Sequence, residues 1–489
     1  MVEPVRTVLP RVVIAAPASG HGKTTVATGL MAALGRTGLV VSCHKIGPDY
    51  IDPGYHSLAT GRPGRNLDAH MVGESRLAPL LLHGAATPVQ ADIAVIEGVM
   101  GLYDGAIGTD GFSSTAHVAR VLGAEIILVV DISSASRTIA AMVHGLATFE
   151  PGIRIGGVIL NKAGSVRHSD EVTRAMAATG IPVIGVLKRD DGISAPSRHL
   201  GLIPMAERGE AEFALDLLAA QVAAGVDLDA VRAIAGRAAL VEATPWDPAA
   251  EMAALQVYPG AQRPVVAIAG GRAFTFRYPE TDELLRAAGL DPVVFDPMTD
   301  TELPAGTAGI YLGGGFPEVH AADLAGNAHM RENLLAAINS GMPTVAECAG
   351  LLYLCRSLDG TEMVGAVPAD GRMSPKLTLS YRQAKAPAMS ALAPLGLTVT
   401  GHEFHRTIVE PAQSEVPAWV RSDAEMGFAL DPADTGRATV HASYLHTHWA
   451  GYPQLAAQFA CAVKDFAQAQ AQAQAETQAH APIEALPSL

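Results

Sequence analysis

Basic residues are scarce in this chain. Lys and Arg total 34 against 49 Asp and Glu, which gives a formal net charge of −15 over 489 residues. Nucleic acids and anionic membranes require concentrated positive charge on the surface that binds them. We therefore expect no nucleic acid and no membrane among the partners. A small anionic substrate in a local basic pocket remains compatible with this balance.

Cysteine is also scarce, and long apolar runs are missing from the start of the chain. The four cysteines form no CxxC pair and no zinc-finger spacing, which favours a reducing compartment over a disulfide framework. The one apolar run near the N-terminus, RVVIAAP, is too short to span a membrane and lacks a cleavage pattern. We predict a soluble, cytoplasmic protein.

Apolar residues, in contrast, are plentiful at 49%, enough for a sizeable core, and the length suits about three average domains or two large ones. Apolar runs alternate with helical patterns, which predicts parallel sheets covered on both faces. A second such series starts at 264 after a Pro-punctuated connection. We predict an α/β fold with two α/β domains. The expected ranges are 1–242 for the first domain, 243–262 for a linker, 263–462 for the second domain and 463–489 for a low-complexity tail.

The segment SGHGKTT, at 19–25, follows the first apolar run and opens a helical pattern. It supplies the GKT of a phosphate-binding loop, although Pro17 stands where that loop usually has its first glycine. Backbone N–H groups and a helix N-terminus would face an anion here, with Lys23 on the outer phosphates and Thr24 on Mg²⁺. A glycine-rich turn is the structural alternative. The predicted ATP-binding residues are Gly20, His21, Gly22, Lys23, Thr24 and Thr25.

Four acids follow predicted strands near this loop. Asp49 and Asp52 lie in KIGPDYIDPGYH, and Glu97 and Asp104 lie in IEGVMGLYDG. Ligands bind at the carboxyl edge of an open parallel sheet, and carboxylates beside Thr24 would make a hard-oxygen Mg²⁺ site. The alternative is that these acids cap turns and helices.

Two further pairs of polar residues also follow strands. Asn161 and Lys162, in NKAG, could contact a purine or form an ordinary turn. Arg198 and His199, in APSRHLGL, could neutralise a substrate carboxylate or form surface ion pairs.

The second half carries a candidate nucleophile. Cys348, in PTVAECAGLLYL, stands at a sharp strand-to-helix turn, and a helix N-terminus lowers a thiol pKa. N–H groups of the glycines in YLGGGFPE, with that of Ala349, could hold an oxyanion. His446, in HASYLHTHW, could act as the base. A buried structural thiol is the alternative, and the other cysteines, Cys43, Cys355 and Cys461, are expected in the core.

These motifs together resemble the a,c-diamide synthases of corrinoid biosynthesis. The likeness covers almost the whole chain except the tail, through GHGKTT, KIGPDYIDPGYH, EGVMGLYDG, SRHLGL, GGGFPE, AECAGLLYL and HASYLHTHW. The N-terminal half resembles ATP-dependent carboxylate activators of the dethiobiotin-synthetase type, and the C-terminal half resembles class I glutamine amidotransferases. In those amidotransferases the elbow is G-x-C-x-G and the histidine motif is often His-Pro-Glu. Here Ala346 replaces the first glycine and His448 stands where the Glu would be.

The resemblance implies two coupled reactions. Cys348 attacks glutamine while His446 moves the proton, and Gly314, Gly315 and Ala349 hold the oxyanion. ATP converts a substrate carboxylate into an acyl phosphate, which ammonia turns into an amide, once on each of two acetate side chains. The implied partners are a corrinoid polycarboxylate, glutamine and ATP, with a homodimer as the candidate assembly.

Further roles follow from the same resemblance. Thr24, Asp49 and Glu97 are expected to hold Mg²⁺. Asp52 and Asp104 are expected to orient substrate or take a proton from ammonia, and His448 is a further catalytic candidate. The expected substrate-binding residues are Lys45, Arg198 and His199.

Several alternatives stay open on the sequence. The substrate could be that of a cobyric acid synthase or of a nickel-sirohydrochlorin amidase. The chain could instead be a P-loop ATPase switch, or a glutaminase regulated by its N-terminal half. Ammonia is expected to pass between the two sites shielded from protonation, and full exchange with free ammonium would contradict this.

Overall fold

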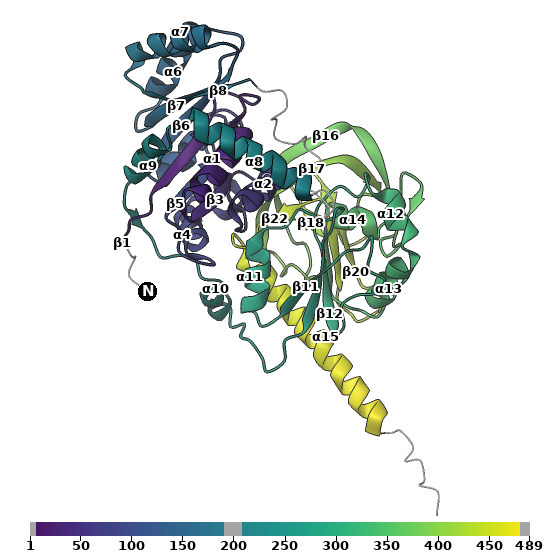
Figure 1. Ribbon diagram of the computed structural model, residues 1–489. Coiled ribbons are helices and arrows are strands. Elements are labelled where there is room, and N and C mark those ends of the chain that lie inside the picture. Colours follow the sequence, from purple (N-terminus) through teal and green to yellow (C-terminus); the bar gives the residue numbers. More distant parts are fainter. Residues whose placement is uncertain (1–5, 190–207, 480–489) are drawn as a thin grey trace, which may run out of the picture. The chain divides into compact units, whose positions relative to one another are not determined.

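The computed structural model describes residues 6–189 and 208–479, and the chain divides into two compact units, Met1–Asp247 and Pro248–Leu489 (Figure 1). The division falls inside the connection predicted at 243–262, part of which forms helix α10 (Pro248–Ala254). Each unit contains a largely parallel sheet with helices packed against it, so the predicted α/β fold class is confirmed.

Among the described residues, the first unit is built on a seven-stranded parallel sheet with the order β4-β3-β5-β2-β6-β7-β8. The strand bounds are Arg11–Ala15 (β2), Val41–Ile46 (β3), Arg65–Leu67 (β4), Ile93–Glu97 (β5), Glu125–Asp131 (β6), Ile155–Ala163 (β7) and Val183–Lys188 (β8). The chain passes from β2 to β3, which lies on one side of β2 in the sheet, and later returns to β6 on the other side. This reversal of direction places the loops after β2, β3 and β5 at the carboxyl edge of the sheet, where ligands bind in such folds.

Alternate residues of the central strands build one core face of this sheet. Val12 and Ile14 of β2 are fully buried, and Ile127 and Val129 of β6 face the same way. Helices α1, α8 and α9 cover this face, and α1 and α8 run side by side (Figure 1). The helix bounds are Lys23–Arg36 (α1), Ile51–Thr60 (α2), Ala69–Val72 (α3), Leu77–Ala86 (α4), Thr115–Val121 (α5), Thr138–Phe149 (α6), Val166–Met176 (α7), Arg208–Gly225 (α8) and Leu228–Gly236 (α9).

A short antiparallel ribbon joins the two ends of the first unit. Strand β1 (Arg6–Thr7) pairs with β9 (Val241–Glu242), with Arg6 opposite Glu242. The Arg6 Nε atom also lies 2.9 Å from Glu242 Oε1. The first and last strands described in this unit therefore lie side by side.

The second unit contains a six-stranded sheet with the order β11-β10-β12-β13-β21-β20, parallel except for β20. The bounds are Val265–Ala269 (β10), Asp291–Phe295 (β11), Thr307–Leu312 (β12), Thr344–Glu347 (β13), Phe428–Leu430 (β20) and Val440–Ser443 (β21). Its core contains Ile310 and Leu312 of β12 with Leu334 and Ile338 of α13. The second alternating series predicted from 264 onward begins with β10 to β13.

The long hairpin of β16 (Asp370–Lys385) and β17 (Thr398–Glu410) dominates a second, mostly antiparallel sheet in this unit (Figure 1). The remaining strands of this sheet are Ser357–Leu358 (β14), Thr361–Glu362 (β15), Trp419–Val420 (β18), Glu425–Met426 (β19) and His446–Thr447 (β22). Strand β22 follows β21 directly and pairs with β17, so the segment HASYLHTH passes from one sheet to the other.

The second unit's helices are α10, given above, and Pro279–Ala287 (α11), Ala321–Gly326 (α12), Ala328–Asn339 (α13), Ala349–Leu354 (α14) and Pro453–Ala479 (α15). The predicted tail from 463 onward extends α15 as far as Ala479. Cys43 and Cys355 are buried as predicted, but the prediction for Cys461 was wrong, because α15 exposes this thiol. Within the described ranges, no helix is both long enough and apolar enough to cross a membrane.

Candidate functional site

The first candidate site lies at the turn between β2 and α1. Gly22 precedes the helix with φ 87° and ψ 24°, and its carbonyl accepts the N–H of Val26 at 3.0 Å. A Cβ at Gly22 would come within 2.3 Å of Asn161 Nδ2, so only glycine fits both the conformation and the space. The first-turn N–H groups of α1 have no acceptor within the helix, which suits this end to an anion.

Contacts from β6 and β7 hold the phosphate-binding loop. Asn161 Nδ2 donates to the His21 carbonyl at 2.9 Å, and Lys162 Nζ donates to the Gly20 carbonyl at 2.8 Å. Lys162 also pairs with Asp131 at 2.7 Å, and the Asp131 N–H donates to His21 Nδ1 at 2.9 Å. The two residues predicted to contact a purine thus contact the loop backbone. Asp131 was not predicted, although an acid directly after the apolar run EIILVV was a signal for it.

Glu97, at the end of β5, is the centre of a buried charge cluster. Its Oε1 accepts from Thr24 Oγ1 at 2.7 Å and from Lys45 Nζ at 3.0 Å, and its Oε2 lies 2.7 Å from His56 Nε2. Burial alone would raise the pKa of Glu97, but Lys45 and His56 hold it well below its usual range. The Glu97 carboxylate therefore stays ionised while fully buried.

Lys45 joins this carboxylate to a second one. Its Nζ lies 2.7 Å from Asp52 Oδ2 and donates to the Gly98 carbonyl at 2.9 Å. Burial raises the pKa of Asp52 to about 6, with a further rise from Glu97 that Lys45 opposes. Lys45 was predicted to bind substrate, but in the structure it is buried and bonded to Asp52 and Glu97.

Asp49 and Asp52 occupy different positions relative to Thr24. Asp49 Oδ1 accepts the N–H groups of Ile51 at 2.7 Å and Asp52 at 3.2 Å, so it caps the start of α2. Asp52 Oδ2 instead lies 3.5 Å from Thr24 Oγ1. The oxygen atoms gathered around Thr24 therefore come from Asp52 and Glu97, whereas the sequence-based ligand set named Asp49.

The loop after β5 brings a further contact to the site. Lys23 Nζ donates to the Met100 carbonyl at 3.1 Å. Asp104 is exposed and accepts the Gly101 N–H at 2.9 Å, as a turn cap does. Arg198 and His199 lie outside the described residues.

The described ranges contain no group of three or more His, Cys, Asp or Glu side chains that could hold a metal ion. A Mg²⁺ ion beside a triphosphate needs fewer protein carboxylates, because phosphate oxygens and waters complete its coordination. The hydroxyl of Thr24 with the carboxylates of Asp52 and Glu97 fits that requirement in ligand type.

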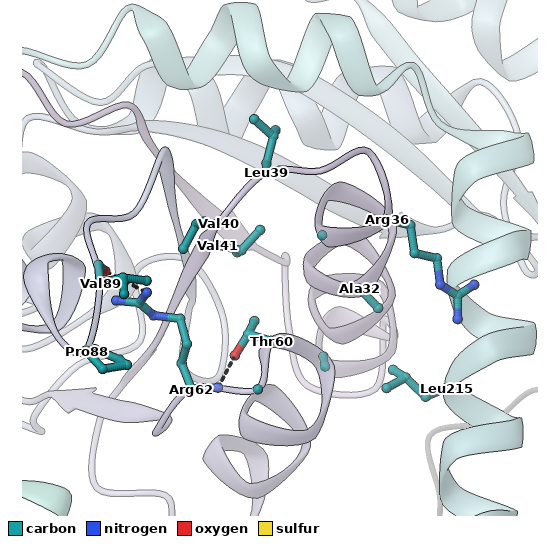
Figure 2. Close-up of a pocket in the computed structure, with 13 residues that line it drawn as sticks. Ala32, Arg36, Leu39, Val40, Val41, Thr60, Arg62, Pro88, Val89 and Leu215 are labelled. Carbon is teal, nitrogen blue, oxygen red and sulfur yellow. Dashed lines mark hydrogen bonds between the residues drawn. The ribbon is translucent and has the colours of Figure 1, made fainter.

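A cavity of about 520 Å³ in the first unit lies elsewhere (Figure 2). Val40 and Val41 line it at the amino end of β3, whereas the charge cluster follows the carboxyl ends of the strands. Arg62, also in its lining, donates to the carbonyls of Thr87 at 2.6 Å and Val89 at 2.8 Å. We therefore assign this cavity no part in the candidate site.

Cys348 forms the second candidate site, at the turn between β13 and α14. Its φ of 51° and ψ of −94° are strained for a residue with a side chain, and its N–H donates to the Ser443 carbonyl at 2.8 Å. Two residues on, a Cβ at Gly350 would come within 2.3 Å of the Leu312 carbonyl oxygen. The turn is thus a nucleophile elbow packed against β12.

His446, the predicted base, lies close to this thiol. It begins β22 and is 1% exposed. Burial lowers its pKa, but Cys348 and Glu347 outweigh burial and raise the pKa to about 10. Cys348 is the main group that opposes burial in setting this pKa, so the thiol and the imidazole are close neighbours.

His448 faces a different element. Its ring stacks on Tyr278 with centroids 4.2 Å apart, and its Nε2 lies 3.8 Å from Glu280 Oε2 of α11. Glu347 Oε2 lies 3.7 Å from His446 Nδ1. Glu347 was not predicted, and its place directly before Cys348 in AEC was the signal available.

The glycine loop after β12 lies against His446 and against the start of α14, which follows Cys348. A Cβ at Gly314 would come within 2.4 Å of His446 Cε1, and the Gly313 carbonyl accepts the Gly350 N–H at 3.1 Å. Of the three predicted oxyanion donors, Gly314 already donates its N–H to the Phe276 carbonyl at 3.1 Å. Ala349 is the first residue of α14, where N–H groups lack acceptors within the helix.

The fold and the two sites define a glutamine amidotransferase unit joined to a P-loop nucleotide-binding unit. Residues 265–454 match the model of the CobB/CobQ-like glutamine amidotransferase domain, and residues 12–203 match that of the CobQ/CobB/MinD/ParA nucleotide-binding domain.

Comparison with whole proteins identifies the family within this class of enzymes. The chain is 61% identical over 460 residues to a hydrogenobyrinate a,c-diamide synthase from Thermobifida fusca, covering 93% of this chain and 97% of that protein. It is 51% identical to the synthase of the same name from Streptomyces coelicolor, covering 92% and 97%, respectively. A cobyrinate a,c-diamide synthase from Synechococcus is 39% identical, covering 91% and 97%. The chain belongs to the a,c-diamide synthase family and is an amide-forming ligase.

Proposed function

We propose that this protein converts the a- and c-acetate carboxylates of hydrogenobyrinic acid into amides, with ATP as the activating reagent and glutamine as the nitrogen donor. The observation that carries the proposal is the 61% identity to a synthase of that name across both units. The presence of Lys23 and Thr24 in one unit, with Cys348 and His446 in the other, supplies both half-reactions in one chain.

In the glutaminase half-reaction, the Cys348 thiolate attacks the side-chain amide carbon of glutamine and forms a C–S bond. The His446 imidazolium donates its proton to the leaving nitrogen, so ammonia departs and a thioester remains. Water then attacks the thioester, with the imidazole accepting a proton, and releases glutamate. Ala349 and Gly315 are the N–H donors we propose for the oxyanion, because the Gly314 N–H is bonded to Phe276.

In the synthetase half-reaction, a substrate carboxylate oxygen attacks the γ-phosphorus of ATP and ADP leaves. Ammonia then attacks the carbonyl carbon of the acyl phosphate, phosphate leaves and an amide remains. Lys23 and the first-turn N–H groups of α1 stabilise the phosphate charge. Thr24, Asp52 and Glu97 would hold Mg²⁺, which neutralises charge on the phosphate oxygens when bound.

Lys45 has a supporting role in this proposal. Its ammonium lies between Asp52 and Glu97 and offsets the repulsion of the two carboxylates before ATP arrives. Asp104, an exposed turn cap, is proposed to hold the loop whose Met100 carbonyl accepts from Lys23. The homodimer stays a prediction.

The test is an assay with Mg-ATP, glutamine and purified hydrogenobyrinic acid, followed by mass spectrometry of the corrin. The expected product has lost an OH and gained an NH₂ at two carboxyls. Cobyrinic acid is assayed in parallel, because the 39% identical relative bears the cobyrinate name. Preference for cobyrinic acid would overturn the proposal that hydrogenobyrinic acid, the cobalt-free acid, is the substrate. Glutamine hydrolysis without amidation of either acid would overturn the corrin substrate and leave another tetrapyrrole acid.

A further inference from the structure

Glu347 occupies a position from which it can orient the catalytic imidazole. Its Oε2 lies 3.7 Å from His446 Nδ1, and both side chains are almost fully buried, at 4% and 1% exposed. Catalytic hydrogen bonds are often long without substrate and tighten when it binds. A carboxylate at Nδ1 favours the tautomer with its proton on that nitrogen, which directs Nε2 to the thiol.

Two hydroxyl groups hold the Glu347 carboxylate in place. Thr447 Oγ1 donates to Oε1 at 2.9 Å, and Tyr311 Oη donates to Oε2 at 3.2 Å. Tyr311 belongs to β12 and Thr447 to β22, so anchors from two elements fix the orientation of the carboxylate. A carboxylate that served packing alone would not need to face the nitrogen of a buried imidazole.

Class I amidotransferases often have this acid two residues after the histidine, but here that position is His448. His448 stands two residues after His446 and contacts Tyr278 and Glu280 instead. Glu347 is adjacent to the nucleophile in sequence, at the last position of β13. Its backbone thus belongs to the strand that leads directly into Cys348.

We propose that Glu347 is the positioning residue of this amidotransferase, and that it completes a Cys348–His446–Glu347 triad in which the acid directly precedes the nucleophile. The proposal rests on the glutaminase half-reaction proposed above. The effect of Glu347 on the pKa of His446 agrees with the proposed triad, because the carboxylate raises the pKa of the imidazole.

The test is Glu347→Gln in the full chain, which keeps the shape of the side chain and removes its charge. We expect kcat for glutamate release to fall about 100-fold or more, with KM within a few-fold of the parent value. The upper limb of the pH profile should move to lower pH, because the imidazolium loses a stabilising charge. Glu347→Asp, which keeps the charge, should recover part of the rate.

A second measurement does not depend on turnover. The rate at which iodoacetamide alkylates Cys348, followed by peptide mass mapping, reports thiolate formation at each pH. In Glu347→Gln the upper inflection of this profile should move in the same direction as in turnover. If the parent protein hydrolyses no glutamine, the proposed glutaminase step fails, and the alkylation profile still decides the role of Glu347.

Two kinds of control separate positioning from packing. Glu280→Gln removes an equally buried carboxylate that contacts His448, and its pH profiles should match those of the parent protein. Tyr311→Phe and Thr447→Val each remove one anchor of the carboxylate, and each should lower kcat, but less than Glu347→Gln does. If Glu347→Gln fails to fold, these two variants still test the proposal, and an unchanged kcat in both would overturn it. Unchanged pH profiles and a kcat within about 3-fold of the parent value in Glu347→Gln would overturn the proposal.

Discussion

At the scale of single residues, the molecule keeps charged groups inside the protein by giving each a specific partner. Glu97 is fully buried yet bonded to Thr24, Lys45 and His56. Such clusters cost solvation and are strongly destabilised when one partner is removed. In the first unit this arrangement keeps a carboxylate ionised beside the phosphate-binding loop before any nucleotide binds.

His441 shows the opposite solution, in which a buried titratable group stays neutral. Burial lowers its pKa to about 3, and its Nδ1 lies 2.9 Å from Ser390 Oγ. An unfolded chain takes up a proton on this residue below its ordinary pKa, whereas the folded chain does not. The stability that His441 contributes is therefore complete above that pKa and is lost as the pH falls toward about 3.

We predict that the second unit loses roughly 2 kcal/mol of stability through His441 alone between pH 7 and pH 5. Urea unfolding at both values measures this. Trp419 is a suitable fluorescent reporter, because its ring lies 5.0 Å from that of His441. In His441→Gln the acid-induced loss should be smaller by about that amount. An equal loss in both proteins would show that the residue does not couple to unfolding.

At the scale of elements, both sites use glycines where two backbones or a backbone and a functional side chain meet. Gly22 begins α1 in a left-handed conformation against Asn161. Gly314 packs against His446 in the same manner. Each unit also contains a glycine at which an added Cβ would meet no neighbouring atom, Gly35 in the first and Gly326 in the second. These two positions supply matched controls.

For the phosphate-binding loop, we predict that Gly22→Ala weakens ATP binding by at least about 10-fold, because the added Cβ strains a φ of 87° and displaces Asn161. Isothermal titration with a non-hydrolysable ATP analogue measures the change. Gly35→Ala, in the last turn of the same helix, meets nothing within 4 Å and should bind as the parent protein does. Equal affinities for both variants would contradict this role of Gly22.

For the glycine loop of the second unit, Gly314→Ala should lower glutaminase kcat roughly 100-fold, because the Cβ would displace the His446 ring. Gly326→Ala, at the end of α12, has no neighbouring atom within 4 Å and should retain the parent rate. Steady-state glutamate release compares the two. The interpretation fails if the two variants have similar rates.

The elements were largely predictable from the sequence, whereas the contacts between distant segments were not. Lys23, Thr24 and Cys348 belong to short motifs whose chemistry is set by the turn that contains them. Asp49 and Asp52 are three residues apart, and only the start of α2 decides which of them faces Thr24. Glu347 stands next to Cys348 in the sequence, but its contact with His446 joins residues almost a hundred positions apart, and only the folded structure shows that contact.

At the scale of the whole molecule, the groups proposed for the two half-reactions belong to different units. Among the described residues, Cys348 and His446 lie in the second unit, and Lys23, Thr24 and Glu97 lie in the first. The two half-reactions should therefore be separable by substitution.

We predict that Cys348→Ser abolishes glutamine-dependent amidation and retains amidation when ammonium chloride replaces glutamine, because the first unit keeps all its reactive groups. The assay is product mass with each nitrogen source at a pH high enough to supply free ammonia. Ser443, whose carbonyl accepts the Cys348 N–H, keeps its contact in this variant. Loss of both activities would indicate that the thiol also supports the synthetase step.

The ribbon of β1 and β9 has a consequence for how such a molecule could be assembled over evolutionary time. Because β1 and β9 pair, the two ends of the described part of the first unit lie side by side, an arrangement that favours transfer or insertion of a unit as one block. Movement of this unit between genes as one block is then a small step for this architecture.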